Sequence, residues 1–78
     1  MIDIKEIEHL TKQALDSHID EEIEKTQPLI EYGMNSINTI SLVLLIEEQY
    51  GITMDDEDLL IENFTTLERI AQTLSKYI

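Results

Sequence analysis

Residues 35–51 read NSINTISLVLLIEEQYG, and this stretch decides the fold. Asn35 is among the favoured helix N-cap residues, and Gly51 readily adopts the left-handed conformation that ends many helices. Because neither glycine nor proline lies between them, the sequence predicts one uninterrupted helix over Ser36–Tyr50. Its apolar side chains cover more than half of the circumference, so we expect it to be the most buried helix of the domain. They are Ile40, Leu42, Val43, Leu44 and Ile46.

Two amphipathic segments flank this central helix. One is predicted from about Asp3 to Ser17 and the other from about Thr66 to Tyr77, because apolar residues recur in both every three or four positions. Both begin with the spacing of a capping box, in which two residues three positions apart cap each other's backbone. The two pairs are Asp3 with Glu6 and Thr65 with Glu68.

A run of four acids, Asp55 to Asp58, follows the central helix. Acids favour a helix N-terminus, so the run predicts a short third helix, with Phe64 filling the core beyond it. A calcium loop starting at Asp55 would need glycine and glutamate where the chain has Leu60 and Thr66. We therefore interpret the run as a solvated helix start and predict no metal site. No strand pattern appears, so the sequence predicts one all-α domain.

The chain is small and strongly acidic. Its 78 residues carry 17 acids, 5 basic residues and a formal charge of -12, which disfavours nucleic acid and anionic membrane surfaces as partners. The charge predicts a partner with a basic docking patch. The alternative interpretation is that the charge only keeps the protein soluble. No cysteine is present, so any thiol must arrive on a cofactor. Carboxylates are too common to single out a general acid and base, and no enzyme activity is predicted.

Nothing at the start of the sequence resembles a signal peptide, because no basic segment precedes an apolar run. The longest apolar run, Leu42 to Ile46, is far shorter than a membrane span. We expect a cytoplasmic protein that does not enter membranes.

Ser36 lies at the predicted start of the central helix, directly after a turn glycine and a capping asparagine. Unpaired backbone N–H groups and the positive end of the helix dipole favour an anionic group at such a position. A phosphodiester on the hydroxyl would be stabilised there. From the residues alone, a serine that only helps to cap the helix remains the stronger interpretation.

The stretch Tyr32-Gly-Met-Asn-Ser-Ile37 resembles the phosphopantetheine attachment motif of acyl and peptidyl carrier proteins, usually a Leu-Gly-x-Asp-Ser-Leu-like run. Residues 39–52 resemble the second helix of that family. Residues 56–59 resemble its third helix, and residues 63–70 resemble the start of its fourth. The resemblance covers residues 1–78, the whole of one carrier domain.

This resemblance implies a four-helix bundle of the acyl-carrier type, with three main helices and a short third one. It also implies that a phosphopantetheinyl transferase attaches 4′-phosphopantetheine from coenzyme A to Ser36, in the motif with Gly33, Met34 and Asn35. Acyl, aminoacyl or peptidyl groups would ride on the arm as thioesters. The implied partners are adenylation or acyl-ligase, condensation, ketosynthase and thioesterase-type enzymes. We expect a stand-alone, monomeric carrier that catalyses nothing itself.

The chain departs from the family pattern in two places. Asn35 stands where the family most often has Asp, which removes a negative charge beside the attachment hydroxyl. Fatty-acid carriers resemble one another in a strongly acidic second helix, whereas the acids here lie mainly at Glu47 and Glu48. Docking is therefore expected to be more apolar, through a stripe of helix positions that faces partners. That stripe is Ile37, Ser41, Leu45 and Glu48.

Several alternatives stay open at this point. A nonribosomal-peptide or polyketide-like pathway is favoured over housekeeping fatty-acid synthesis, and a D-alanine carrier is a third option. An unmodified acidic interaction module is the rival from another class. Leu45 could equally pack under the long connection predicted from His18 to Met34, before the central helix, and Met34 and Ile52 are predicted neighbours of the arm.

Overall fold

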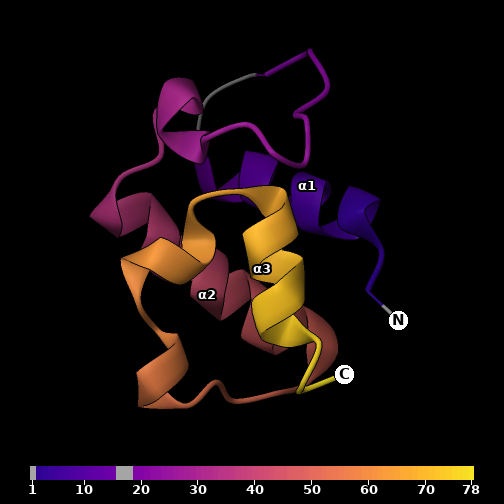
Figure 1. Ribbon diagram of the computed structural model, residues 1–78, viewed down its shortest axis with the longest axis vertical. Helices are drawn as coiled ribbons and strands as arrows, with labels where there is room; N and C mark the ends of the chain where they lie inside the picture. Colours follow the sequence, from indigo (N-terminus) through magenta and orange to yellow (C-terminus); the bar gives the residue numbers. More distant parts are fainter. Residues whose placement is uncertain (1, 16–18) are drawn as a thin grey trace.

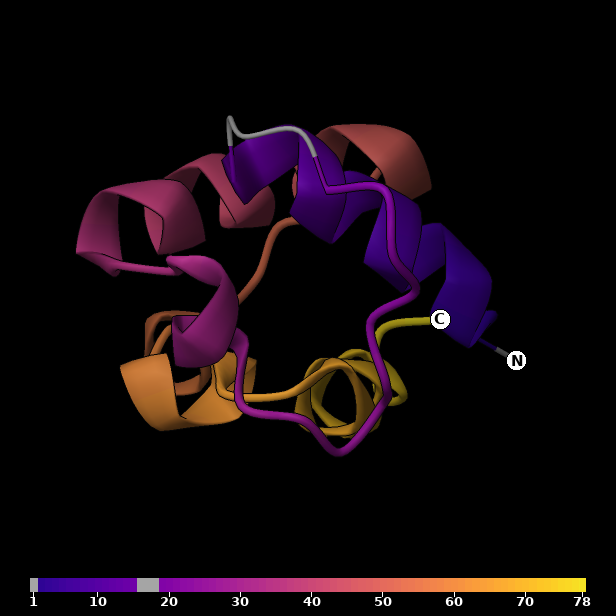
Figure 2. The same cartoon turned by 90° about the horizontal axis from the view of Figure 1, so that it is seen from above.

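The computed structural model describes residues 2–15 and 19–78 (Figure 1). These residues form α-helices and 3-10 turns without a strand, which confirms the all-α class. The helix α1 contacts both α2 and α3, and the three enclose one core (Figure 2). The elements in chain order are α1 (Ile4–Leu15), η1 (Leu29–Tyr32), α2 (Ser36–Tyr50), η2 (Asp56–Asp58), η3 (Ile61–Phe64) and α3 (Leu67–Leu74).

The central helix α2 has the predicted bounds. Asn35 Oδ1 accepts a hydrogen bond from the backbone N–H of Asn38 at 2.9 Å, which is the expected N-cap. At the other end Gly51 has a φ of 64°, a left-handed conformation that strains other residues. Both ends of α2 are therefore set by residues that lie next to it in the sequence.

The capping box predicted for α1 is half right. Asp3 Oδ1 accepts from the N–H of Lys5 at 2.9 Å, so Asp3 does cap the helix. Glu6 does not reach back, because its carboxylate accepts from the Tyr50 hydroxyl at 2.8 Å and so links α1 to the end of α2. Burial and this carboxylate raise the pKa of Tyr50 to about 12. The predicted end of the helix at Ser17 lies outside the described residues.

The last helix begins at Leu67, one residue later than predicted, and ends earlier than predicted. Thr66, rather than Thr65, is the N-cap, and its hydroxyl accepts from the N–H of Arg69 at 3.0 Å. The α-helical bonds end at Leu74, beyond which Tyr77 packs against the core as a turn residue. The last α-helix is therefore shorter than its apolar periodicity suggests.

The predicted short third helix is present in the 3-10 form and not as an α-helix. Residues 55–64 form the two 3-10 turns η2 and η3, separated by an extended Leu60. The amide of buried Asn63 donates to the carbonyl of Asp58 at 2.9 Å, which occupies an oxygen that an α-helix would need for its own ladder. This segment forms one wall of the site described below, so we call it the 55–64 wall.

The sequence predicts that α2 is the most buried helix, and this prediction is wrong, because α1 is more buried than α2. Only Thr39, Leu42 and Ile46 of α2 are buried, whereas Ile40 and Leu44 are 62% and 60% exposed. The physical reason is the short 55–64 wall, which covers only one edge of α2 where a full helix would cover more. A strip of aliphatic side chains consequently faces outward along α2.

The long connection before α2 packs as part of the core. Ile23 and Leu29 are buried in it, and the N–H of Leu29 donates to the carbonyl of Thr65 at 2.8 Å. The carboxylate of Glu8 on α1 accepts from the N–H of Ile23 at 2.9 Å. The connection is thus held to α1 on one side and to the start of α3 on the other, which fixes the approach of the chain to α2.

A polar cluster holds the 55–64 wall to the end of the chain. Asp58 accepts a hydrogen bond from the Tyr77 hydroxyl and lies 2.7 Å from the Lys76 ammonium nitrogen, while Tyr77 accepts from the N–H of Asp55 at 2.8 Å. Asp58 is buried, so the expectation that the whole acidic run is solvated is wrong for this residue. The hydrogen bonds from Lys76 and then Tyr77 hold the pKa of Asp58 below its ordinary value.

Asp58→Asn is expected to lower the stability of the domain at neutral pH and to lose that effect in acid. A carboxylate with a depressed folded-state pKa stabilises the fold above its unfolded pKa, and this contribution disappears as pH falls through the folded value. The gap between wild type and variant should therefore be constant at neutral pH and shrink below about 3.8. Urea unfolding at several pH values measures it. Asp56→Asn, an exposed neighbour, is the matched control, and an equal loss in both variants would contradict the role of Asp58.

Candidate functional site

Ser36 is the first residue of α2, and its side chain is exposed. A tight turn delivers it there: Gly33 ends η1 with a φ of 93°, and its N–H donates to the carbonyl of Ile30 at 3.1 Å. Met34 follows and is buried in the core. The buried Met34 side chain anchors the turn to the core, and the Ser36 hydroxyl two residues later is held at the surface.

The first turn of α2 is anchored to its surroundings by side chains. The Asn38 amide donates to the carbonyl of Ala14 near the end of α1 at 3.0 Å. The Thr39 hydroxyl and N–H both donate to the carbonyl of Asn35, at 2.8 and 2.9 Å. These bonds make the start of α2 a rigid platform for Ser36.

The electrostatics at this platform suit an anion. The leading N–H groups of a helix have no carbonyl within the helix to bond, and they carry the positive end of its dipole. The first turn of α2 holds no acidic side chain, and the cap before it is the neutral amide of Asn35. A phosphodiester on the Ser36 hydroxyl would therefore meet favourable dipoles without a nearby carboxylate on the same turn.

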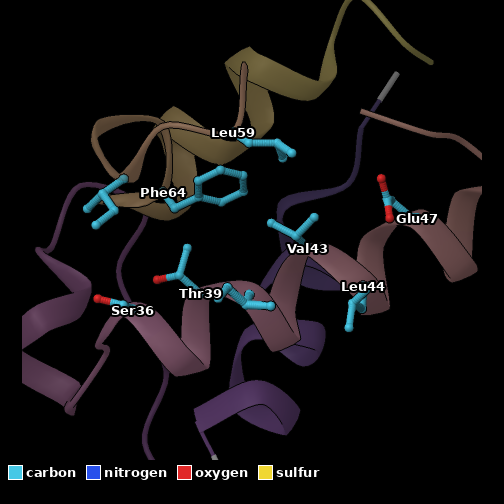
Figure 3. Close-up of a pocket in the computed structure, with 9 residues that line it drawn as sticks. Ser36, Thr39, Val43, Leu44, Glu47, Leu59 and Phe64 are labelled. Atoms are coloured by element: carbon cyan, nitrogen blue, oxygen red, sulfur yellow. The ribbon is translucent and has the colours of Figure 1, made fainter. Parts of the chain in front are cut away.

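Two apolar hollows adjoin Ser36. The first is a groove of about 400 Å³ between α2 and the 55–64 wall, with Ser36 at one end and Glu47 at the other (Figure 3). Leu59 and Phe64 project from the wall toward Thr39 and Val43 of α2. The second hollow, also about 400 Å³, lies on the η1 side of Ser36. Both hollows include Ser36, Thr39, Ile61 and Phe64 in their linings.

The carboxylate of Glu47, at the far end of the groove, already makes a hydrogen bond within the fold. Glu47 Oε2 accepts from the N–H of Met54 at 2.9 Å, in the loop that leads from α2 to the 55–64 wall. Most of the remaining lining is aliphatic or aromatic. The groove is therefore suited to an extended, largely apolar chain that starts at Ser36.

The predicted partner stripe is placed in part as expected. Ile37, Ser41 and Glu48 are exposed on α2, whereas Leu45 is half-buried and packs against the core. None of the four lines either hollow. Whether these residues meet partners stays a prediction.

Sequence reasoning missed the aliphatic residues beside Ser36. Ile40 and Leu44 follow Ser36 at intervals of four and lie along the groove, while Ile61 lies between the two hollows. Counting in fours from Ser36 would have found the first two. Of the predicted neighbours of the arm, Met34 lines the second hollow and Ile52 lines neither.

The part of the chain that the structure describes contains no cluster of histidine, aspartate and glutamate suited to hold a metal ion. No helix among residues 2–15 and 19–78 is long and apolar enough to cross a membrane.

Comparisons with known proteins agree with this geometry. The sequence model of the family described as "Phosphopantetheine attachment site" matches residues 6–74. A search of curated protein sequences gives no significant match. Among solved structures, the chain is similar to the carrier protein in the crystal structure of Bradyrhizobium japonicum glycine:[carrier protein] ligase complexed with glycylated carrier protein. The TM-score is 0.77 at 17% identity, over 90% of this chain and 95% of that one, so the likeness shows a shared fold.

Proposed function

This chain belongs to the phosphopantetheine attachment family of carrier proteins, and on that premise we propose that Ser36 bears the arm and that acyl, aminoacyl or peptidyl groups ride on it as thioesters. Its cofactor is 4′-phosphopantetheine, held covalently. The arm supplies the thiol that a chain without cysteine lacks. Carrier domains are not catalytic, so the task of the protein is to present its cargo.

The position of Ser36 is the observation that carries this assignment. It is an exposed serine on the first turn of α2, after the Gly33 turn, beside two hollows and within the matched region. Ser41 is exposed on the same helix but lies in its middle, where the backbone N–H groups are already bonded, and it lines neither hollow. Both the anion-stabilising dipole and the space for an arm therefore favour Ser36.

The attachment step is a phosphoryl-type transfer. The Ser36 hydroxyl oxygen forms a bond to the phosphorus of coenzyme A that bears the pantetheine, and the bond from that phosphorus to adenosine bisphosphate breaks. The hydroxyl proton passes to a base on the transferase, and adenosine bisphosphate leaves. On the carrier side, the rigid first turn holds the oxygen in place, and the helix N-terminus stabilises the phosphodiester that results.

For the cargo, we propose an aminoacyl, peptidyl or polyketide-like group in preference to the fatty acyl group of a housekeeping carrier. The support is the uncharged first half of α2, which differs from the acidic second helix typical of fatty-acid carriers. The structural neighbour, whose carrier is glycylated, adds a second reason to test amino acids first. Adenylating or acyl-ligase enzymes would then load the arm, and condensation-type enzymes would unload it.

Intact mass tests the proposal directly. The protein is incubated with coenzyme A and a broad-specificity phosphopantetheinyl transferase, beside a carrier that this enzyme is known to modify. One phosphopantetheine adduct per chain is expected. An unchanged mass, while the control carrier is fully modified, would refute the carrier assignment. It would favour the unmodified interaction module.

A further inference from the structure

The two sides of the 55–64 wall are held by different kinds of contact. Toward α2 the wall presents apolar side chains that line the groove, among them Leu59 and Phe64 (Figure 3). Among the residues that the structure describes, no hydrogen bond or ion pair joins the wall to α2. Toward α3, Asn63 Oδ1 accepts a hydrogen bond from the Arg69 guanidinium at 3.1 Å. The groove therefore lies along a boundary that hydrogen bonds do not cross.

Three side chains at and behind η2 tie the wall to the end of the chain. We call Asp58, Lys76 and Tyr77 the latch. The Tyr77 hydroxyl donates to the Asp58 carboxylate and also accepts from the N–H of Asp55 at 2.8 Å. The Lys76 nitrogen lies 2.7 Å from the other Asp58 oxygen. Because the Tyr77 ring packs against the core, the latch joins η2 to the body of the domain.

Burial contributes little to the position of η2. Of residues 55–62 only Asp58 is buried, and the others are exposed. The 3-10 turn has poorer hydrogen-bond geometry than an α-helix. Segments with few buried apolar contacts open locally at a lower free energy than the whole fold. Residues 55–62 therefore depend on the latch more than on packing.

Both ends of this segment are fixed by bonds that do not involve the latch. Before it, the N–H of Met54 donates to Glu47 on α2 at 2.9 Å. After it, the carbonyl of Thr65 accepts from the N–H of Leu29 at 2.8 Å. Loss of the latch would therefore free the middle of the segment and leave its two ends in place.

We propose that the latch holds residues 55–62 closed beside the groove, and that its release lets them swing away from α2 while α1, α2 and α3 stay folded. Leu59 and Ile61 line the groove from this segment, so its movement would widen the groove. The inference goes beyond the proposed function, because it concerns the unmodified chain. For a carrier, the latch would set how much room a cargo finds beside Ser36.

Amide hydrogen exchange, followed by NMR in the unmodified protein, tests the latch. Tyr77→Phe removes the hydroxyl and keeps the ring. The amides of Asp58 and Leu59, which are bonded within the η2 turn, should then exchange about tenfold faster, because a hydrogen bond to a charged group shifts an equilibrium by about this factor. Lys76→Met should speed them about threefold, since its ammonium is half exposed and screened by water. Circular dichroism checks folding, and Lys76→Met decides if Tyr77→Phe does not fold.

Ile7→Val is the control that separates local opening from unfolding of the whole domain. Ile7 is fully buried on α1, so the lost methylene weakens the entire fold and speeds exchange of the slowest amides of α1 and α2. The Asp58 and Leu59 amides should stay within about twofold of wild type, because a segment that opens by itself does not need the rest to unfold. An equal response of these amides to Ile7→Val and Tyr77→Phe would overturn the inference. So would wild-type rates in both latch variants.

A single thiol measures whether the groove itself widens. Thr39 is buried, and Leu59 and Phe64 project toward it from the wall (Figure 3). Because the chain has no cysteine, Thr39→Cys provides one reporter beneath the wall. Adding Tyr77→Phe should speed its alkylation by iodoacetamide about as much as it speeds the Asp58 and Leu59 amides. Faster amides with an unchanged thiol rate would overturn the inference, because the segment would then loosen without opening the groove. Neither measurement needs a modified Ser36, so the proposed function is tested separately.

Discussion

Ser36→Ala is expected to lose phosphopantetheine attachment completely and to keep the unfolding midpoint of wild type. The hydroxyl oxygen is the atom that forms the new bond, so no other change is needed to abolish the adduct. The side chain is exposed, and the helix cap is made by Asn35. Alanine is well tolerated in the first turn of a helix, so the fold should be unaffected. Intact mass after incubation with coenzyme A and transferase measures the first effect, and circular dichroism measures the second.

Ser41→Ala is the matched control for this variant. It removes an exposed serine hydroxyl from the same helix, five residues further along, and should still gain one phosphopantetheine per chain at completion. An adduct that persists in Ser36→Ala would assign the attachment to another residue. Loss of the adduct in both variants would point to a general defect of α2 and not to the loss of one oxygen.

Leu42→Ala is expected to be strongly destabilising. Leu42 is fully buried between α2 and the core, and truncation of a buried leucine to alanine costs about 2–5 kcal/mol through lost burial and the cavity left behind. A domain of this size has a total stability of about 4–12 kcal/mol, so the loss is a large share of it. The free energy of unfolding in urea, extrapolated to water, is the measurement.

Leu44→Ala provides the comparison within the same helix. Leu44 is exposed, so the identical truncation should change the free energy of unfolding by no more than about 0.5 kcal/mol. If the two variants lost equal stability, the orientation of α2 described above would be wrong. The pair therefore tests which face of α2 is buried, independently of any modification.

The bounds of α2 could be predicted from the sequence because both ends depend on local chemistry. Asn35 caps through a hydrogen bond to a residue three positions away, and Gly51 ends the helix through its own backbone conformation. The position of Ser36 at the helix start follows from the same local signals. No distant contact was needed to predict either feature, which is why both were predicted correctly.

The burial of α2 could not be predicted in the same way. Apolar periodicity shows which side chains avoid water in isolation, but the face that is covered depends on what packs against it. Ile40 and Leu44 are exposed because the 55–64 wall is built of 3-10 turns and not of a longer helix. Hydropathy alone gives Leu44 and Leu45 the same rank, yet only Leu45 packs against the core.

The shape of the wall itself depends on contacts between residues far apart in the sequence. Asp58 is held by Lys76 and Tyr77, and Asn63 turns back onto the carbonyl of Asp58. The acidic run of residues 55–58 gives no sign that Lys76, Tyr77 and Asn63 will contact it. The wall side of the groove beside Ser36 could therefore not be predicted from the sequence, although the serine at the end of the groove could.

The site of the arm can be measured directly by mass spectrometry. Wild-type protein is modified with coenzyme A and the transferase, digested, and the phosphopantetheine-bearing peptide is fragmented in the mass spectrometer. We expect the fragment ions to place the whole modification on Ser36, with Ser41 and Ser75 unmodified. Phosphopantetheine on either of those serines, or on any other hydroxyl while Ser36 stays free, would contradict it.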